Sequence, residues 1–321
     1  MKVAILGKIH QDGLDFLKSH NIKIIKIDDF NESRVLTKIY DVNGIVIRTA
    51  QLSKKILSKC KNLKIVSRHG VGFDNIDLDY LNKKNIALTI TGQSNAISVS
   101  EHVMTMMLVL SKNIIASDNI TRSNRFSSKE TLPDFFELYE KKIFILGFGR
   151  IGQALAKRCL GFDMKVMVHD PFIDKKIIVS NKCIPIDKIE GYKKADFISI
   201  HLPLNKDTKN FISHYEFNLF KKNLILINTA RGGIVDEDAM YEALKYKKIF
   251  AAGIDVFEKE PPQKDHKLFS LKNTLLTPHN SALTLECRKR MSVESCTNVF
   301  NFLIDKKNFI KSNLVNLHGV N

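Results

Sequence analysis

Three ionisable side chains in the second half of the chain, Arg231, Glu260 and His279, each follow an apolar run. Their local sequences are Asn-Thr-Ala-Arg-Gly-Gly, Asp-Val-Phe-Glu-Lys-Glu-Pro and Thr-Pro-His. All three come after a glycine-rich turn at residues 147–152, with the sequence Gly-Phe-Gly-Arg-Ile-Gly. A dinucleotide-binding turn followed by a guanidinium, a carboxylate and an imidazole is typical of a hydride-transfer site.

The three side-chain types suit different parts of such a reaction. A guanidinium such as Arg231 at the end of a strand can bind a 2-oxo acid through paired N–H donors and polarise its carbonyl. An imidazole such as His279 titrates near neutral pH, as a proton donor to a forming alkoxide must. A neighbouring carboxylate raises the pKa of a histidine and fixes its tautomer. Glu260 is the candidate for that role and Glu258 its competitor, while exposed turn charges are the alternative for Arg231 and Glu258.

The glycine-rich turn has the context that a cofactor site needs. A strand is expected over residues 143–146 before it, and a helix opens at residues 153–158 after it. Gly147 permits the tight turn, Gly149 lets the backbone approach a pyrophosphate, and Gly152 lets the helix pack on the strand. Amides at the helix N-terminus then favour the phosphates, and we also place Arg150 and Ile151 at the cofactor.

An acidic residue follows the next expected strand, 166–169. Asp170 lies 23 residues after Gly147, near the spacing of about 20 expected for a carboxylate that binds the ribose hydroxyls. Because it would repel a 2′-phosphate, it favours NAD over NADP. The alternative is that Asp170 only caps the turn before Pro171. His201 is expected to line the cofactor crevice in a structural role, and the further cofactor candidates are Pro203, Thr208, Thr229, Ala230 and Asp255.

Composition restricts the class of protein. The chain has 321 residues, a net charge of +16 and 44% hydrophobic residues, which indicates two globular domains. The basic residues are dispersed in pairs without an aromatic-interleaved patch, so we expect no nucleic-acid partner. No apolar stretch has the membrane-spanning length of about 18 residues. Five scattered cysteines without a C-x-x-C pair indicate free thiols in the cytoplasm, and we expect no metal site.

Short apolar runs alternate with helix-like segments, which predicts parallel α/β sheets. A Ser98–Glu101 capping box is expected to open a buried helix to about residue 110, which joins the domains, forms a subunit interface, or does both. A polar loop is expected over 121–141 and a helix over about 284–304, where the chain crosses back. The expected strands are 2–6, 22–27, 44–47, 63–67 and 86–90, then 143–147, 166–169, 197–200, 224–227, 250–256 and 274–277.

The start of the chain is a weak internal repeat of the cofactor turn. Residues 2–7, Lys-Val-Ala-Ile-Leu-Gly, resemble residues 142–147, Lys-Ile-Phe-Ile-Leu-Gly. The first copy lacks the second and third glycines. We therefore expect a similar βα unit that does not hold a pyrophosphate.

The glycine-rich turn and the segments around Arg231, Glu260 and His279 together resemble the NAD-dependent D-isomer-specific 2-hydroxyacid dehydrogenases. The resemblance covers nearly the whole chain. It implies two Rossmann-like doubly wound parallel-sheet domains, with an NAD-binding domain at 98–284 inserted into a substrate-binding domain at 1–97 and 285–321. It also implies that Arg231, Glu260 and His279 are catalytic and that the protein is a homodimer or homotetramer.

Within that family, residues 67–77, Ser-Arg-His-Gly-Val-Gly-Phe-Asp-Asn-Ile-Asp, resemble the substrate loop of 3-phosphoglycerate dehydrogenases. Gly70 and Gly72 are expected to leave backbone amides free for a substrate carboxylate, and we also assign Val71 to the substrate. Arg48 and Arg68 end adjacent expected strands and are candidates for a phosphate; ordinary surface arginines are the alternative. The substrate implied is 3-phospho-D-glycerate, oxidised to 3-phosphohydroxypyruvate in serine synthesis.

One segment departs from the family pattern. Asn280-Ser281-Ala282 follows His279, where many members have glycines, which leaves the substrate open. A hydroxypyruvate or glyoxylate reductase, or another D-2-hydroxyacid dehydrogenase, is the alternative enzyme. A non-enzymatic NAD-sensing protein that resembles transcriptional co-repressors is the alternative of another class. Since the sequence ends soon after residue 310, no carboxy-terminal regulatory domain and no feedback inhibition by serine are expected.

Overall fold

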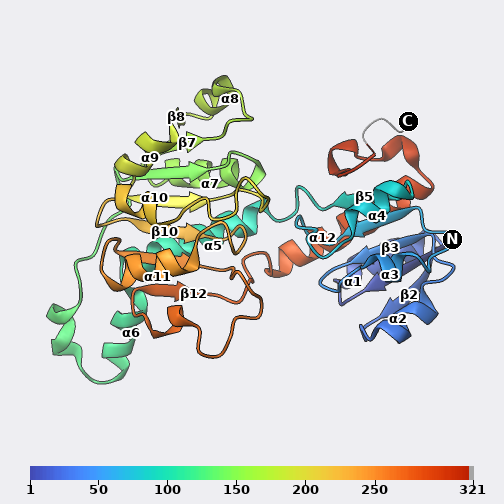
Figure 1. Ribbon diagram of the computed structural model, residues 1–321, viewed down its shortest axis with the longest axis horizontal. Coiled ribbons are helices and arrows are strands. Elements are labelled where there is room, and N and C mark those ends of the chain that lie inside the picture. The colour runs from blue at the N-terminus through green and yellow to red at the C-terminus, as the bar shows by residue number, and fades with distance from the viewer. Residues whose placement is uncertain (318–321) are drawn as a thin grey trace. The chain divides into compact units, whose positions relative to one another are not determined.

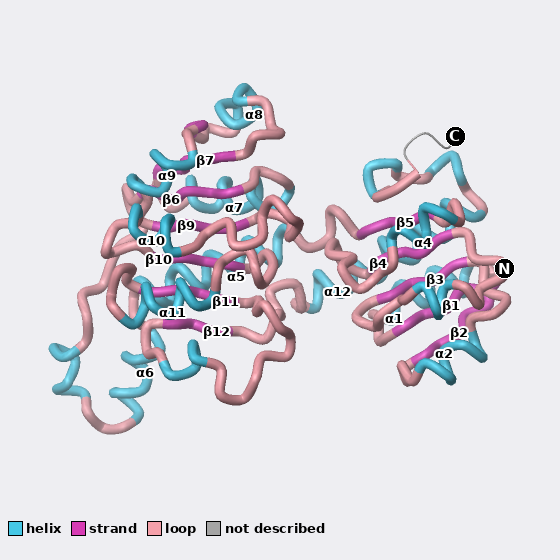
Figure 2. Tube along the Cα trace, viewed as in Figure 1, coloured by secondary structure: helices cyan, strands magenta, loops and turns pink. Residues whose placement is uncertain are grey.

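A computed structural model of the chain describes residues 1–317, which divide into two compact units. Unit 1 contains residues 1–95 and the chain from residue 282 onward; unit 2 contains residues 96–281 (Figure 1). Unit 2 is therefore an insertion within the sequence of unit 1. Helices and strands alternate in both units (Figure 2). Among the described helices, none combines the length and the apolar character that crossing a membrane requires.

Unit 1 is a parallel sheet of five strands in the order β2-β1-β3-β4-β5. The strands are β1 Lys2–Leu6, β2 Lys23–Ile27, β3 Gly44–Ile47, β4 Ile65–Arg68 and β5 Ala87–Ile90. The helices are α1 Gln11–Ser19, α2 Glu32–Lys38, α3 Lys54–Leu57, α4 Leu78–Lys83 and α12 Leu285–Leu303, with the 3₁₀ turns η3 Lys306–Asn308 and η4 Lys311–Asn313.

The sheet of unit 1 is buried on both faces. Leu14 and Leu17 of α1 pack with Cys296 and Val299 of α12 in one apolar cluster. A second cluster joins alternate strand residues to the side chains of α2, α3 and α4. This two-sided burial explains why inner strands such as β1 and β3 read as nearly continuous apolar runs in the sequence, whereas the edge strand β2 has two exposed lysines.

Unit 2 is a parallel sheet of seven strands in the order β12-β11-β10-β9-β6-β7-β8. The order reverses between β6 and β9, and in such sheets ligands bind at the carboxyl ends of the strands beside that point. The strands are β6 Lys142–Leu146, β7 Lys165–His169, β8 Ile184–Pro185, β9 Phe197–Ile200, β10 Ile225–Asn228, β11 Ala251–Ile254 and β12 Thr274–Leu276.

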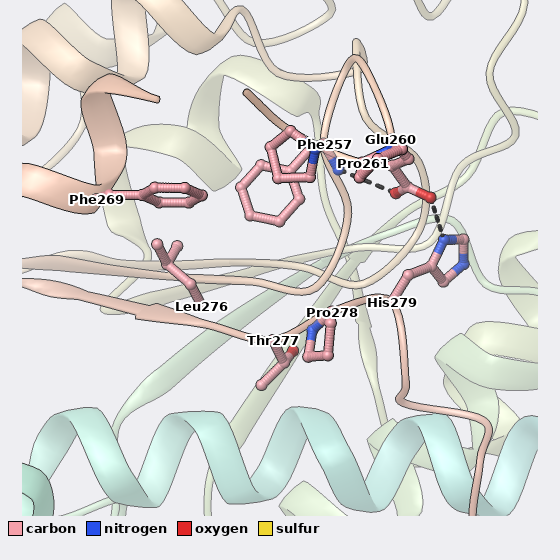
Figure 3. A pocket seen from close by; sticks show the side chains of 9 residues that line it. Phe257, Glu260, Pro261, Phe269, Leu276, Thr277, Pro278 and His279 are labelled. Atoms are coloured by element: carbon pink, nitrogen blue, oxygen red, sulfur yellow. Dashed lines mark hydrogen bonds and ion pairs between the residues drawn. The ribbon is translucent and has the colours of Figure 1, made fainter. Parts of the chain in front are cut away.

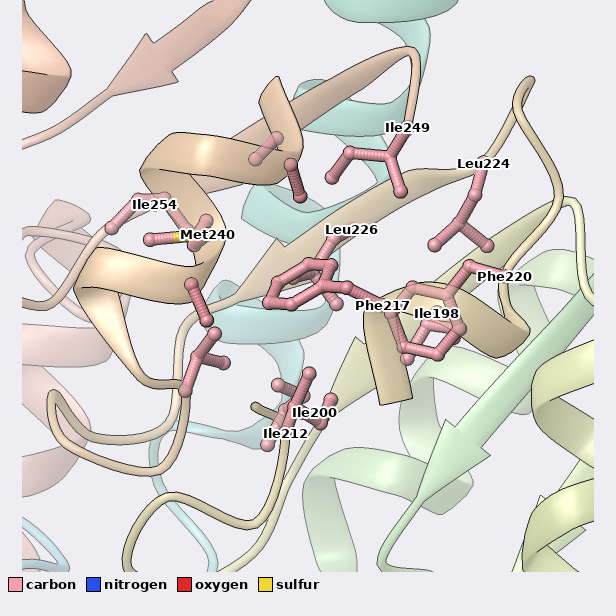
Figure 4. Close-up of a cluster of buried hydrophobic side chains, with 14 of the residues drawn as sticks. Ile198, Ile200, Ile212, Phe217, Phe220, Leu224, Leu226, Met240, Ile249 and Ile254 are labelled. Carbon is pink, nitrogen blue, oxygen red and sulfur yellow. The ribbon is translucent and has the colours of Figure 1, made fainter. Parts of the chain in front are cut away.

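Helices of unit 2 cover both faces of this sheet. Alternation along β6 sends Ile143 and Ile145 into a cluster with α5 and α7, and sends Phe144 and Leu146 into a cluster with α9, α10 and α11. Figure 4 shows part of the second cluster, including Phe217, Leu226 and Met240. The helices are α5 Ala96–Ser111, α6 Ile114–Arg122, α7 Arg150–Leu160, α8 Lys175–Ser180, α9 Lys188–Lys194, α10 His214–Leu219 and α11 Glu237–Lys245, with the 3₁₀ turns η1 Phe126–Thr131 and η2 Lys267–Ser270.

The two-sheet α/β fold is confirmed, while three local predictions are wrong and one short strand was missed. Helix α5 begins at Ala96, so Ser98 lies inside it and donates to the Ser281 carbonyl (2.6 Å) instead of forming a capping box. The expected loop over 121–141 contains the end of α6 and a 3₁₀ turn. Helix α7 begins at Arg150, three residues before the expected start, and the two-residue strand β8 was not predicted.

Candidate active site

The glycine-rich turn is shaped by close backbone approaches. Gly147 has φ +92°, and a Cβ there would lie 2.6 Å from the carbonyl oxygen of His201. A Cβ on Gly152 would lie 2.2 Å from the Gly147 oxygen, so only glycine lets α7 begin this close to the turn. A Cβ on Gly149, the N-cap of α7, would meet nothing within 4 Å among the described residues. The turn therefore leaves open space in front of a helix N-terminus, the environment that a pyrophosphate requires.

Asp170 connects this turn to the end of β7. One carboxylate oxygen accepts from the Phe148 N–H (2.8 Å), and the other accepts from the Phe172 N–H (2.9 Å). The second bond is the turn cap considered as the alternative from sequence, and the first holds the glycine-rich turn. Since each carboxylate oxygen has a second lone pair, the cap does not prevent a ribose contact.

The remaining cofactor candidates lie in the same unit, around the strand ends. Arg150 is exposed and Ile151 half-buried at the start of α7. His201 follows β9, with Nε2 2.9 Å from the Ser199 hydroxyl, and burial lowers the pKa of its ring. The Thr208 hydroxyl donates to the Pro203 carbonyl (2.5 Å).

Thr229 carries a buried hydroxyl that suits a ligand contact. Its hydroxyl is buried and has no hydrogen-bond partner among the described residues, and buried polar groups are nearly always paired. Ala230, the next residue, donates its N–H to the Asn228 side chain (3.1 Å). The orphaned hydroxyl, together with the open space at Gly149, fits a dinucleotide at the carboxyl ends of these strands.

Arg231 lies in the turn that follows β10, and Asn228 holds this turn. The Asn228 side chain donates to the Arg231 carbonyl (3.0 Å) in addition to accepting from Ala230. The Arg231 guanidinium donates to the Ala230 carbonyl (2.6 Å). A short buried strand that ends in an asparagine thus fixes the backbone position from which the Arg231 side chain extends.

His279 is held in an uncommon backbone conformation three residues after β12. Its φ is +50°, in the left-handed region that non-glycine residues seldom occupy. Its N–H donates to the Asp255 carbonyl (2.8 Å). The fully buried Asp255 carboxylate accepts from the Thr277 hydroxyl (2.6 Å) and the N–H groups of Asn280 (2.9 Å) and Ser281 (3.1 Å). Asp255 therefore organises the whole turn, including the residues that replace the usual glycines.

Glu260 pairs with His279. Its Oε2 lies 2.7 Å from His279 Nδ1, and its Oε1 accepts from the Phe257 N–H (3.1 Å) (Figure 3). Burial opposes ionisation of Glu260, but the hydrogen bond and charge of His279, the Phe257 N–H and the charge of Arg231 together lower its pKa. Glu258, its competitor from sequence, is exposed. With Nδ1 engaged, Nε2 is the nitrogen left to exchange a proton with a substrate.

The pair borders an apolar cavity of about 310 Å³. Figure 3 shows the Glu260 and His279 side chains at one side of this space and the aromatic ring of Phe269 at the other. The lining residues are Phe257, Glu260, Pro261, Pro262, Phe269, Leu276, Thr277, Pro278 and His279.

The candidate substrate residues belong to unit 1. Strands β3 and β4 are neighbours, with Ile47 paired to Arg68, so Arg48 and Arg68 do end adjacent strands. The Arg48 guanidinium makes one long contact with the Lys8 carbonyl (3.4 Å). The Arg68 guanidinium donates to the carbonyls of Gly72 (2.6 Å) and His69 (2.7 Å). Arg68 thus shapes the loop that carries Val71 and Gly72.

One expectation about this loop is wrong. The Gly70 N–H donates to the Arg68 carbonyl (2.9 Å), so it is not free for a substrate carboxylate. The cause is the tight turn after β4, in which Gly70 has φ +142°. The N–H groups of Val71 and Gly72 make no backbone hydrogen bond among residues 1–317, and they are the better candidates.

Two histidines near the candidate residues were not predicted from the sequence. His102 of α5 lies 3.1 Å from the Thr277 hydroxyl, which in turn bonds Asp255. His69 is 4% exposed in the candidate substrate loop, and neither ring nitrogen has a partner among the described residues. The sequence signal for His102 is a histidine within the apolar stretch of α5, and that for His69 is its place between Arg68 and Gly70.

A family comparison agrees with the geometry of unit 2. The model of the "D-isomer specific 2-hydroxyacid dehydrogenase, NAD binding domain" matches residues 104–281. This range contains the glycine-rich turn, Asp170 and the Arg231, Glu260 and His279 trio, and it makes NAD the cofactor of this domain.

Individual relatives extend the likeness to nearly the whole chain. A D-3-phosphoglycerate dehydrogenase of Methanocaldococcus jannaschii is 36% identical over 90% of this chain, which spans only 55% of that relative's length. A hydroxypyruvate reductase of Thermotoga maritima is 35% identical over 93% of this chain and 97% of its own. A D-lactate dehydrogenase of Aquifex aeolicus, solved with NAD and lactic acid, superimposes with a TM-score of 0.85 at 29% identity over 98% of both chains.

Proposed function

Because the chain belongs to the D-isomer specific 2-hydroxyacid dehydrogenase family, we propose that it is an NAD-dependent dehydrogenase that oxidises 3-phospho-D-glycerate to 3-phosphohydroxypyruvate. The observation that carries the proposal is the 2.7 Å contact between His279 Nδ1 and Glu260 Oε2. A carboxylate that holds one imidazole nitrogen leaves the other poised for acid–base chemistry. Unit 1 is proposed as the substrate-binding domain predicted at 1–97 and 285–321, and unit 2 as the NAD-binding domain predicted at 98–284.

Each residue of the trio has a separate role in the proposed reaction. Arg231 binds the substrate carboxylate and C2 oxygen through its guanidinium. In oxidation, neutral His279 takes the hydroxyl proton on Nε2, and in reduction it returns that proton to the forming alkoxide. Glu260, whose pKa is lowered, stays ionised and stabilises the imidazolium. Bound NAD supplies the nicotinamide that exchanges hydride with C2.

Cofactor binding is assigned to the chain's own turn and strand ends. The N-terminus of α7 and Gly149 are proposed to bind the pyrophosphate, and Asp170 the ribose hydroxyls. The orphaned Thr229 hydroxyl and the turn at Ala230 are proposed to contact the nicotinamide half. His201, Pro203, Thr208 and Asp255 complete the cofactor site, the last by holding the His279 turn.

The test of the chemistry is the His279→Ala variant in a steady-state assay with NADH. General acid–base catalysis contributes about 10²–10⁴-fold, so kcat should fall within that range while NADH affinity is retained. His214→Ala, which alters an exposed histidine of α10, is the matched control. A near-wild-type kcat for His279→Ala would remove the proposed mechanism.

The choice of substrate needs its own experiment. The assay compares phosphohydroxypyruvate, hydroxypyruvate, glyoxylate, pyruvate and 2-oxoglutarate. If Arg48 binds the phosphate, Arg48→Ala should raise KM for phosphohydroxypyruvate about ten-fold or more and leave KM for glyoxylate nearly unchanged. Arg34→Ala, an exposed arginine paired with Asp29, is the control. Equal kcat/KM with and without the phosphate would refute phosphate recognition.

A specific observation favours the second candidate, a hydroxypyruvate or glyoxylate reductase. The Arg68 guanidinium is already bonded to two loop carbonyls. A small unphosphorylated 2-oxo acid does not require an arginine for a phosphate. The same substrate panel decides between the two, since this enzyme would prefer hydroxypyruvate or glyoxylate.

Assembly and location complete the proposal. Exposed apolar side chains at Ile114, Ile115, Phe126, Phe135 and Tyr139 of unit 2 support a homodimer or homotetramer. The five cysteines, all reduced, support a cytoplasmic location. Light scattering on the purified protein measures the mass, and a monomer at micromolar concentration would contradict the assembly.

A further inference from the structure

Glu260 lies in a loop, and a second carboxylate holds both ends of that loop. We call residues 256–266 the Glu260 loop. Glu237, in the first turn of α11, accepts from the Glu258 N–H through Oε1 (2.8 Å). Its other oxygen, Oε2, lies 3.0 Å from His266 Nε2. One side chain therefore contacts the chain two residues before Glu260 and six residues after it.

Both partners of the second contact are shielded from solvent. The Glu237 and His266 side chains are each 13% exposed, far less than the 37% and 45% of Glu260 and His279. Hydrogen bonds to a carboxylate gain strength when water is excluded. The contact of Glu237 with His266 is thus better protected from solvent than the contact of Glu260 with His279.

Aromatic packing restricts the His266 ring further. Its centroid lies 5.4 Å from those of both Phe257 and Phe269, and these two phenyl rings also meet edge to face at 6.2 Å. Phe257 carries the N–H that binds Glu260 Oε1. The contact of Glu237 with His266 thereby reaches the backbone group that orients the Glu260 carboxylate.

A neighbouring ion pair also joins the start of α11 to the end of the Glu260 loop. Asp238 forms an ion pair with Lys267, the residue after His266. The charged groups that act on Glu260 itself are His279 and Arg231. Glu237 is separate from these, because its carboxylate oxygens contact the Glu258 N–H and His266 Nε2.

We propose that Glu237, through Glu258 and His266, is a positioning residue that holds the Glu260 loop so that Glu260 meets His279 Nδ1. This inference rests on the proposed function of the pair. Without Glu237, the Glu258 N–H and the His266 ring lose their acceptor, and the Glu260 carboxylate samples positions away from His279. The His279 imidazole then loses a fixed tautomer.

A double-mutant cycle tests this inference with kcat/KM as the readout. Glu237→Ala should lower kcat/KM about ten-fold, with NADH affinity unchanged within about two-fold. In the Glu260→Ala background, Glu237→Ala should lower kcat/KM by less than about two-fold, because the carboxylate that it positions is gone. An equal loss in both backgrounds, or no loss in either, would refute the inference.

Conservative variants separate positioning from folding. Glu237→Gln keeps an acceptor for the Glu258 N–H and should restore most of the activity. His266→Phe keeps an aromatic ring beside Phe257 and Phe269 and removes both ring nitrogens, of which Nδ1 has no partner among the described residues and Nε2 contacts Glu237. It should therefore reproduce a smaller, equally non-additive loss even if Glu237→Ala does not fold. Glu242→Ala, an exposed carboxylate of α11, should change nothing. Full activity of His266→Phe and no rescue by Glu237→Gln would count against the inference.

A readout independent of turnover separates this inference from the proposed function. Nitrogen-15 NMR of the histidine rings shows which His279 nitrogen carries the proton. The wild type should show a single tautomer protonated at Nδ1, and Glu237→Ala a mixture. If the chain reduces no 2-oxo acid, the proposed function fails and the tautomer still decides the role of Glu237; an unchanged single tautomer refutes that role.

Discussion

The first βα turns of the two units begin alike and then diverge. Each starts with a five-residue strand, β1 or β6, followed by a glycine with φ of +103° (Gly7) or +92° (Gly147). Each glycine N–H donates to the last carbonyl of the neighbouring parallel strand, at 3.2 Å to Ile27 and 3.0 Å to His169. The internal repeat seen in the sequence is therefore a repeat of backbone geometry.

The divergence begins after that glycine. In unit 2, Gly149 leaves the N-terminus of α7 without a side-chain cap, and Gly152 lets α7 approach its own turn. In unit 1, His10 caps α1 by accepting from the Asp12 N–H (3.3 Å). A Cβ on Gly13 would meet the Ser292 hydroxyl of α12 at 2.3 Å. A positive-φ glycine thus marks a tight strand-to-helix turn, while an anion site also needs an uncapped helix and a second, unobstructed glycine.

The largest effect is expected from a substitution that deforms the glycine-rich turn of unit 2. Gly152→Val places side-chain carbons against the Gly147 carbonyl, which a Cβ would approach to 2.2 Å. The turn must deform, so NADH affinity should fall at least about 100-fold, or about 2.7 kcal/mol. Fluorescence titration of NADH measures this. Retained affinity would show that the cofactor does not use this turn.

The corresponding change in unit 1 should act on stability alone. In Gly13→Ala the new Cβ lies 2.5 Å from the Ser292 backbone oxygen, so α1 and α12 must separate. Overpacking of this kind costs about 1–3 kcal/mol. Hydrogen exchange should speed up in α1 and α12, while NADH affinity stays the same. A loss of NADH binding would contradict the division of roles between the two turns.

Gly149→Ala sharpens the comparison because it is sterically harmless to the folded chain. Gly149 has an ordinary φ of −70° and open space at its Cβ position. Stability against urea should therefore be unchanged, while a methyl group in the proposed pyrophosphate site should weaken NADH binding about ten-fold, or about 1.4 kcal/mol. Wild-type affinity would place the phosphates elsewhere.

The most gradual expected effect concerns a buried histidine of unit 1. Burial, aided by the charges of Arg48 and Arg68, lowers the pKa of His69 from 6.5 to about 4. Its unfolded form binds a proton first as pH falls, so its contribution to stability is complete above pH 6.5 and is lost towards pH 4. The loss should be on the order of 1 kcal/mol per pH unit.

His69→Gln isolates this contribution. The variant should unfold in urea with a weaker pH dependence than the wild type between pH 6.5 and 4. Other titrating groups act on both proteins and cancel in the difference. The buried His69 ring has no hydrogen-bond partner among the described residues, whereas His201 of unit 2 has the Ser199 hydroxyl beside its Nε2. If variant and wild type showed the same pH dependence of unfolding, the pKa of His69 would be equal in the folded and unfolded states and the prediction would be wrong.

Much of the architecture was predictable from the sequence because its signals are local. Apolar runs of four or five residues, separated by helix-like segments, predicted nearly all the strands within one or two residues. The two-residue strand β8 carries too short a run to be recognised. The Ser98–Glu101 pattern fits a capping box, yet the Ser98 hydroxyl bonds the Ser281 carbonyl, far along the chain. Local patterns do not encode such long-range partners.

The sequence by itself determined the chemical types of the site, through the glycine spacing and the Arg231, Glu260 and His279 segments. Only the tertiary structure decided which groups meet. It pairs Glu260 rather than Glu258 with His279, assigns the Gly70 N–H to Arg68, and brings Glu237 to both ends of the Glu260 loop. The physical reason is range: helix and strand periodicity act over a few residues, whereas a hydrogen bond is set by where distant segments pack.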